Sequence, residues 1–292
     1  MAEETHIDTR PPEGANPDWT VPQDWSAYSE TDHRTWDTLF ARQAKLLPGR
    51  ASQSYLRGLD VLKLSKPGIP DFEELSDRLM ALTGWQVVAV PGLVPDDVFF
   101  DHMANRRFVA GNFIRRPDQL DYLQEPDVFH DVFGHVPMLA DPRFADYLEA
   151  YGRGGLRALE LGALKQLARL YWYTVEFGLI DEPEGLRIYG SGIVSSYSES
   201  TFALDDPSPN RIRFDLERVM RTDYRIDDFQ QSYFVIPSFD ELLRVTIETD
   251  FEPVYERIVG KPDIAIDAIL PEDDVITRGT QRYAREKAAE PA

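Results

Sequence analysis

The chain has 292 residues, a formal net charge of −20 and no cysteine. So acidic a surface argues against binding to nucleic-acid backbones and to anionic membranes. The missing thiols exclude disulfides, zinc ribbons, thiolate-ligated haem and iron–sulfur clusters, so any metal must use His, Asp or Glu. No apolar run reaches the about 18 residues of a membrane span, and no basic-then-apolar leader begins the sequence, so we expect a cytoplasmic protein.

The first half of the chain is predicted to be mostly helical. Residues 1–25 are polar and proline-rich, which predicts an irregular arm. Apolar residues then recur at helical spacing, and a short buried strand is expected at Trp85–Val90 before the Pro91-Gly92 turn. The helices predicted here are Thr31–Leu47, Gln53–Leu62, Asp71–Leu82 and Asp96–Met103, with an extended segment at Arg107–Ile114.

The second half is predicted to hold further helices and a hairpin. A helix at Pro142–Tyr151 should be broken by the Gly-Arg-Gly-Gly run at 152–155, and the longest helix should cover Ala158–Leu179. We expect the last twenty residues to be loose. The remaining predicted elements are a hairpin of Leu186–Tyr189 and Ile193–Ser195, a strand at Ser232–Pro237 and a helix at Phe239–Ile247. The fold class is therefore mainly α with a few short β-strands, in one domain over residues 26–270, between the arm and a polar tail at 271–292.

Two of the five histidines lie close together in the apolar run 126–139. His130 and His135 are five residues apart, a spacing that on a regular α-helix points the two rings about 140° apart. Gly134 and Pro137 predict that the helix loosens here, which would let both imidazoles converge on one point. Imidazole is a common metal ligand. The run indicates either a metal site or two core histidines bonded to backbone carbonyls.

A carboxylate is predicted to lie in an apolar helix. Glu176 stands among aromatic and β-branched residues, where an unpaired carboxylate is costly to bury. It should therefore pair with an arginine such as Arg169 or Arg187, or bind a metal. Two histidines and one carboxylate form the facial triad that holds Fe(II) and leaves positions open for oxygen. His130, His135 and Glu176 are therefore candidate iron ligands.

Three motifs, in this order, resemble the pterin-dependent aromatic amino acid hydroxylases. They are PDVFHDVFGHVP at 126–137, YWYTVEFGL at 171–179 and RIYGSGIVSS at 187–196. The likeness runs from about residue 28 to about residue 250, and it implies a single-domain helical basket with a small sheet, the catalytic domain of that family. It also implies a monooxygenase that uses Fe(II), tetrahydrobiopterin and O2 to hydroxylate an aromatic amino acid.

The resemblance assigns roles to individual residues. His130, His135 and Glu176 match the family's iron ligands. Arg115 matches the arginine that holds the substrate carboxylate, a task that suits its forked guanidinium. Ser195 matches a serine that supports a histidine ligand near the substrate, and such a bond fixes the orientation of the ligand.

Further residues match positions around the substrate ring and the pterin. Pro126, Trp172 and Phe177 fall where the family forms an apolar slot for the ring. Phe99 matches the aromatic residue that stacks on the pterin. The residues that match other pterin contacts are Gly92, Val94, Asp131 and Tyr171.

The chain departs from other members of the family in several places. Asp131 replaces a glutamate of the animal members, and Leu123 replaces a threonine that would help Arg115. Ile226 stands where tyrosine hydroxylases carry an aspartate, which favours L-phenylalanine over tyrosine or tryptophan because its ring has no hydroxyl to satisfy. The sequence shows no amino-terminal regulatory domain and no carboxy-terminal heptads, so we expect a monomer.

Two other classes of function stay open. The same three ligands could hold zinc in a hydrolase, which would work without pterin and use Asp131 as the adjacent general base. Alternatively, an acidic helical protein that only binds a partner would hold no stoichiometric metal.

Overall fold

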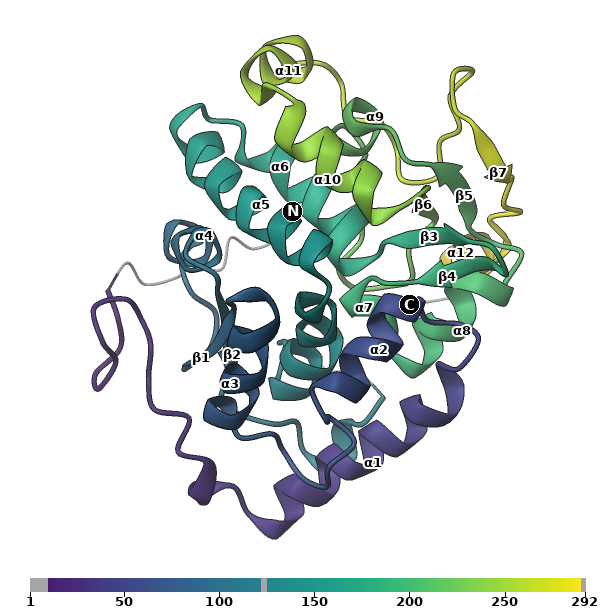
Figure 1. Cartoon of the computed structure of the whole chain (residues 1–292). Coiled ribbons are helices and arrows are strands. Elements are labelled where there is room, and N and C mark those ends of the chain that lie inside the picture. Colours follow the sequence, from purple (N-terminus) through teal and green to yellow (C-terminus); the bar gives the residue numbers. More distant parts are fainter. Residues whose placement is uncertain (1–9, 122–124, 290–292) are drawn as a thin grey trace.

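Helices are the main secondary structure of the described residues, together with two small sheets (Figure 1). The computed structural model describes residues 10–121 and 125–289. No helix in these ranges is long and apolar enough to cross a membrane. The α-helices are α1 Glu30–Leu46, α2 Gln53–Val61, α3 Phe72–Thr83, α4 Asp96–Ala104, α5 Pro142–Glu160, α6 Leu164–Tyr171, α7 Ser191–Val194, α8 Tyr197–Asp205, α9 Leu216–Met220, α10 Phe239–Glu248, α11 Phe251–Ile258 and α12 Arg282–Ala288.

The first three helices begin at side-chain caps. Ser29 and Asp32 form a capping box at α1, Ser52 caps α2 and Asp71 caps α3. Helix α3 ends at Gly84, whose positive φ of 76° suits a glycine. These signals are local in the sequence, and the predicted bounds of the three helices lie within one residue of the observed ones.

The strands form a two-stranded and a five-stranded sheet. β1 Gln86–Val90 and β2 Arg107–Gly111 pair in parallel, as the predicted strand and extended segment allow. The larger sheet has the order β4-β3-β6-β5-β7, in which the central pairs β3·β6 and β6·β5 are parallel and both edge pairs are antiparallel. Its strands are β3 Leu179–Glu182, β4 Gly185–Ile188, β5 Asn210–Arg213, β6 Ser232–Ile236 and β7 Val275–Thr277.

The predicted break at residues 152–155 is wrong, because α5 runs through all four of them. Gly152 and Gly155 face α4, where a methyl group would collide with the backbone of Ala104 or with the ring of Phe100. The glycines therefore allow two helices to approach closely and do not end one. α5 ends near Gly162, which has a φ of +65°, so the helix predicted at Ala158–Leu179 begins at Leu164 instead and becomes π-helical at Trp172. The prediction that it is the longest helix is wrong, because α5 is longer.

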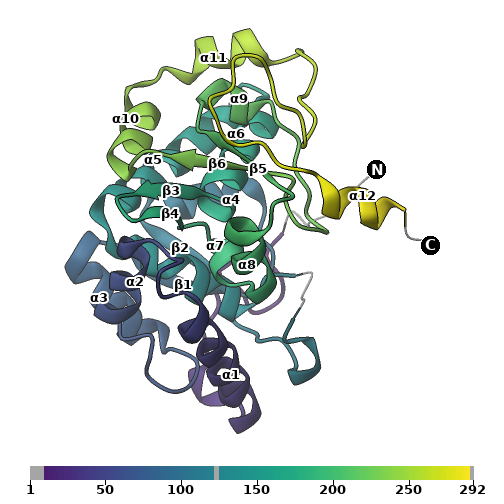
Figure 2. The same cartoon turned by 90° about the vertical axis from the view of Figure 1, so that its right-hand side faces the viewer.

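Two further predictions near the sheet are wrong. The hairpin partner of β4 is β3, and Ser191–Val194 is the short helix α7. The tight turn falls at residues 183–184, directly before Gly185, whose φ of +112° strongly favours glycine. The end of the chain is not loose throughout, because β7 pairs with β5 (Figure 1) and α12 follows it (Figure 2).

The segment that carries the two histidines is anchored in the core. The rings of Phe129 and Phe133 stack with centroids 4.7 Å apart, and Trp36 meets Phe129 edge-on at 5.2 Å. The hydroxyl of Tyr55 donates to the backbone carbonyl of Phe133 at 2.7 Å. All four aromatic side chains are buried. Core packing on both sides of His130 therefore fixes the position of the histidine segment.

Candidate active site

His130 and His135 lie in a π-helical segment, Phe129–His135. In a π-helix the backbone hydrogen bonds span five residues, so side chains at that spacing lie on one face. The two Nε2 atoms are 3.3 Å apart, and the prediction that the helix loosens to bring the rings together is confirmed. Gly134 makes room for this, because a Cβ there would lie 3.0 Å from the Ser191 carbonyl oxygen.

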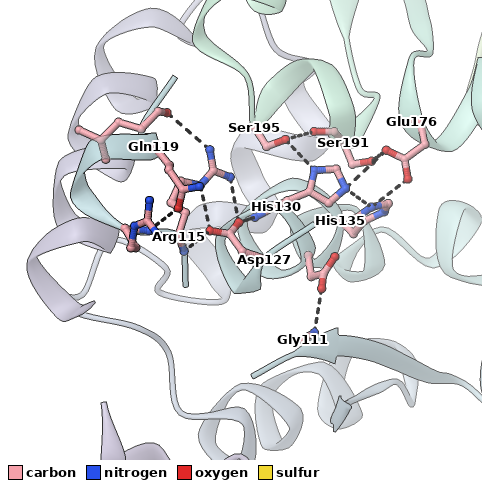
Figure 3. Close-up of polar contacts among 12 residues, drawn as sticks. Gly111, Arg115, Gln119, Asp127, His130, His135, Glu176, Ser191 and Ser195 are labelled. Atoms are coloured by element: carbon pink, nitrogen blue, oxygen red, sulfur yellow. Dashed lines mark hydrogen bonds and ion pairs between the residues drawn. The ribbon is translucent and has the colours of Figure 1, made fainter. Parts of the chain in front are cut away.

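Glu176 reaches the same point from a second π-helical segment, Trp172–Glu176 (Figure 3). Its Oε1 lies 3.2 Å from Nε2 of His135, and its Oε2 lies 3.7 Å from Nε2 of His130. Burial acts to raise the pKa of Glu176, but the two histidines and a hydrogen bond from Ser191 outweigh it and lower the pKa to about 2. The site therefore contains an ionised carboxylate.

An arginine partner for Glu176, the alternative expected from sequence, is not what the structure shows. Arg169 pairs with Asp223 and with Asp263, at 2.8 Å for the latter. Arg187 donates to the backbone carbonyl of Leu186 at 2.9 Å. Among the described residues, the polar contacts of the Glu176 carboxylate are therefore to the two histidines and to Ser191.

Two serines orient these side chains. Ser195 Oγ donates to the carbonyl of Ser191 at 2.6 Å and lies 3.0 Å from Nδ1 of His130. Because its own proton is used, Ser195 accepts the Nδ1–H of His130, which leaves Nε2 free as a ligand atom. Ser191 Oγ donates to Glu176 Oε2 at 2.8 Å. The resemblance assigned a role to Ser195 but none to Ser191, although both lie in the motif at 187–196.

The three donors fit a divalent metal ion. Ligand atoms about 2.1 Å from one ion and at right angles to each other lie about 3 Å apart, close to the observed 3.2–3.7 Å. Burial lowers the pKa of His130 to about 4, so this imidazole is neutral. Neutral imidazole and ionised carboxylate are the forms that bind metals. The set is the two-histidine, one-carboxylate arrangement typical of non-haem Fe(II).

Arg115 holds a partner that the sequence did not predict. Its Nε and Nη2 donate to the carboxylate of Asp127 at 2.9 and 2.8 Å, and Asp127 is fully buried. Among the residues that the structure describes, its Nη1 makes only a long contact of 3.5 Å to the Leu120 carbonyl oxygen. One prong of the guanidinium therefore remains for another anion. Leu123, which we expected to weaken this arginine's grip, lies outside the described residues.

Comparison with known proteins identifies the family. The sequence-family model of the biopterin-dependent aromatic amino acid hydroxylases matches residues 21–252 of the chain. The chain belongs to this family. The helical basket predicted from the motifs is therefore confirmed, and the alternatives of a zinc hydrolase and of a non-enzymatic binding protein are set aside.

Several members of the hydroxylase family are close relatives. The phenylalanine-4-hydroxylase of Caulobacter vibrioides is 66% identical over 274 residues, which are 94% of this chain and 93% of that protein. The iron- and phenylalanine-bound phenylalanine hydroxylase of Chromobacterium violaceum has a TM-score of 0.85 and 56% identity, covering 89% of this chain and 94% of that one. The same enzyme with iron(III) and 7,8-dihydrobiopterin has a TM-score of 0.86 and 56% identity, covering 92% and 94%.

All five residues that resemble the hydroxylases' pterin contacts share one cavity of about 170 Å³. The cavity opens onto the two histidines and Glu176. Asp131 accepts a hydrogen bond from the Gly111 N–H at 2.8 Å, and burial raises the pKa of Asp131 to about 7. One of its oxygens lies within 4.8 Å of ligand atoms of both histidines. The predicted residues that line the cavity are Gly92, Val94, Phe99, Pro126, Asp131 and Tyr171.

The remaining candidates lie outside this cavity. Trp172 stacks on Tyr224 with centroids 4.3 Å apart and packs on Phe177 at 4.8 Å. Ile226 is 66% exposed on the loop before β6, so its side chain touches neither the cavity nor the core. Ser195 contacts Nδ1 of His130, and Arg115 pairs with Asp127, which accepts the backbone N–H of His130. The apolar slot expected for the substrate ring therefore contains an aromatic stack, whereas the structure does not bring the exposed Ile226 to it.

Proposed function

We propose that this hydroxylase converts L-phenylalanine to L-tyrosine with O2, using Fe(II) and tetrahydrobiopterin. The observation that carries the proposal is the meeting of His130, His135 and Glu176 at 3.2–3.7 Å in one buried site. It is supported by the 66% identity to the phenylalanine-4-hydroxylase of Caulobacter vibrioides. When bound, the iron and the pterin together would activate dioxygen for insertion into an aromatic ring.

The side chains around the three ligands position the reactants. His130, His135 and Glu176 would hold the ion, and an ion held by two histidines and one carboxylate would supply the chemistry that activates oxygen. Arg115 pairs with the substrate carboxylate through the prong that Asp127 does not occupy. The amino acid is thereby held by its charged end, with its ring directed to the iron.

The substrate ring and the pterin contact different residues of the site. Pro126, Trp172 and Phe177 form the apolar slot for the substrate ring, and the preference for phenylalanine over tyrosine or tryptophan is supported by the likeness to phenylalanine-4-hydroxylases, not by the exposed Ile226. Phe99 stacks on the pterin. The other pterin contacts are the backbone of Gly92 and Val94 and the side chains of Asp131 and Tyr171.

We also propose the setting in which the enzyme works. Residues 26–270 form the catalytic domain, residues 1–25 an arm and residues 271–292 a tail. The protein acts as a monomer in the cytoplasm, and its net charge of −20 supports this because like-charged copies repel each other.

The experiment is an aerobic assay of the purified protein with Fe(II), a tetrahydropterin and L-phenylalanine, in which tyrosine is followed by its fluorescence. We expect tyrosine only when iron, pterin and oxygen are all present, and a lower kcat/KM with L-tryptophan or L-tyrosine as substrate. Protein loaded with zinc is the matched control and should make no tyrosine. Failure of the iron-loaded protein to form tyrosine would contradict the proposal.

A further inference from the structure

Three aromatic rings form a stack beside the carboxylate of the iron site. The indole of Trp172 lies between the rings of Tyr224, at 4.3 Å and an interplanar angle of 19°, and Phe177, at 4.8 Å and 32°. Trp172 begins the π-helical segment that ends at Glu176, and Phe177 is the next residue. The same π-helical segment therefore carries a ring of the stack and Glu176, a proposed iron ligand. The angle of the indole determines how much space remains for a substrate ring.

One buried amide holds the edge of this indole. Gln230 is 2% exposed, and its Oε1 accepts a hydrogen bond from the Trp172 Nε1–H at 3.1 Å. The indole N–H only donates, so the amide oxygen must face it. The stacked rings restrain the faces of the indole, and the hydrogen bond restrains its rotation in the plane. Without Gln230 the indole N–H would lose its hydrogen-bond partner.

The same amide also fixes the loop that carries Tyr224. The Nε2 of Gln230 donates to the carbonyl oxygens of Arg225 at 2.7 Å and of Asp228 at 3.4 Å, and its Oε1 accepts the Arg225 N–H at 3.4 Å. Arg225 lies between Tyr224, which stacks on Trp172, and the exposed Ile226. Gln230 therefore holds Trp172 directly and holds its stacking partner through the backbone.

The backbone of Gln230 is also held in place by a buried carboxylate. Its backbone N–H donates to Glu199 Oε1 at 3.5 Å, and the same carboxylate accepts the hydroxyl of Tyr233. Glu199 and Tyr233 are buried, and Tyr233 belongs to β6, the central strand of the five-stranded sheet. The amide therefore has a rigid base on the sheet, as a residue needs if it is to position another side chain.

We propose that Gln230 is a positioning residue that sets the width of the aromatic slot and so the choice between phenylalanine and larger aromatic substrates. The inference rests on the proposed function, because it takes Trp172 as a wall of the slot. Gln230 acts through Trp172 and Tyr224 and does not touch the substrate.

The test compares Gln230→Leu with the unaltered enzyme. Loss of one hydrogen bond to the indole should raise the Kd for L-phenylalanine, measured by calorimetry, between about two- and tenfold. The KM for L-phenylalanine should rise with it, the KM for the pterin should not change, and the ratio of kcat/KM for phenylalanine over tryptophan should fall. Gln231→Leu is the matched control, because Gln231 is the next residue and is only half-buried.

A second variant tests the indole side of the contact. Trp172→Phe removes the N–H and keeps an aromatic ring, so it breaks the hydrogen bond even where Gln230→Leu fails to fold. If Gln230 acts through the indole, the double variant should bind L-phenylalanine about as weakly as the weaker single variant. Two results would overturn the inference: an unchanged Kd with only a lower Tm, or an equal loss of pterin and phenylalanine affinity. If the unaltered enzyme makes no tyrosine, the proposed function fails and not the role of Gln230.

Discussion

The guanidinium of Arg115 forms a two-point ion pair with the buried carboxylate of Asp127, at 2.9 and 2.8 Å. The same carboxylate accepts the backbone N–H of His130 at 3.0 Å. Burial alone would raise the pKa of Asp127, but hydrogen bonds and the charge of Arg115 outweigh it and lower this pKa. One ionised group therefore couples the arginine proposed for substrate binding to the segment that carries a proposed iron ligand.

Replacing Asp127 should damage substrate binding and stability together. Asp127→Asn keeps the shape and removes the charge, so Arg115 loses its orientation and the KM for L-phenylalanine should rise at least about tenfold. Leaving a buried arginine without its partner should lower the free energy of unfolding by about 3 kcal/mol. Steady-state kinetics and urea denaturation measure the two effects.

The control for Asp127 is an ion pair at the surface. Asp121 pairs with Arg42 at 2.5 Å, but its side chain is 82% exposed. Asp121→Asn should change stability by less than about 1 kcal/mol and leave the KM unchanged. An Asp127→Asn variant with the KM of the unaltered enzyme would show that Arg115 needs no fixed orientation.

Removing the serine behind His130 should weaken metal binding without unfolding the protein. Ser195→Ala deletes the acceptor for the Nδ1–H of His130, 3.0 Å away. Loss of such a partner costs about 10–100-fold in metal affinity or activity. Iron titration followed by metal analysis measures the change. Ser198, exposed on α8, supplies the control Ser198→Ala, for which we expect no change in iron affinity. Equal iron affinity in both variants would contradict the role of Ser195.

Two glycines of α5 should respond in opposite directions to the same substitution. Gly155→Ala would force a methyl group into the ring of Phe100, and we expect a loss of about 1–3 kcal/mol in the free energy of unfolding. A Cβ at Gly154 meets nothing within 4 Å, so Gly154→Ala should stabilise the helix by up to about 1 kcal/mol. Thermal melts of the two variants distinguish them, and a stabilising Gly155→Ala would show that α4 and α5 are not closely packed there.

Local signals made the helices of the first half predictable, because Ser29, Ser52 and Asp71 cap them from within the sequence. The helix through Gly155 was not predictable, since its reason is a contact with Phe100 on another helix. Strand β5 was missed because Asn210–Arg213 is short and polar. Arg211 can nevertheless be buried there, because its guanidinium donates hydrogen bonds to the backbone carbonyls of Ala203 and Asp206.

The residues of the site likewise divide into those that the sequence predicted and those that it did not. Gly134 indicated the loosened helix, and the motifs placed the two histidines, Glu176 and most of the cavity-lining residues. No role was predicted for Asp127 or Ser191. Each acts through a contact with a side chain on another segment, Arg115 for Asp127 and Glu176 for Ser191, and such a contact leaves no spacing pattern in the sequence. Gln230 was missed for the same reason, since its partner Trp172 is 58 positions away.

Acid should weaken the protein partly through His102. This side chain is fully buried, with Nε2 2.7 Å from the Asp18 carbonyl oxygen, and burial lowers its pKa below the usual 6.5. In the unfolded chain it binds a proton more readily, so between its folded pKa and about 6.5 the free energy of unfolding rises with pH. This contribution is lost as the pH falls below about 6.5.

Urea denaturation between pH 5 and pH 7.5 measures the effect of His102. One such group contributes a slope of at most about 1.4 kcal/mol per pH unit. His102→Gln keeps a donor toward Asp18 and does not titrate, so its stability should depend less steeply on pH than that of the unaltered protein. The exposed control Gln53→Ala, at the start of α2, should keep the original slope. An identical slope in His102→Gln would contradict the assignment.

The central claim is that His130, His135 and Glu176 hold the iron that hydroxylates phenylalanine. The most direct measurement is tyrosine formed per iron bound, with circular dichroism as the check of folding, in the unaltered enzyme and in Glu176→Gln. We predict that Glu176→Gln keeps its helix content, retains no stoichiometric iron and loses more than about 100-fold in tyrosine formation, exceeding the loss from a residue that only supports a ligand. A folded Glu176→Gln protein that holds no iron and still makes tyrosine at the original rate would contradict the account.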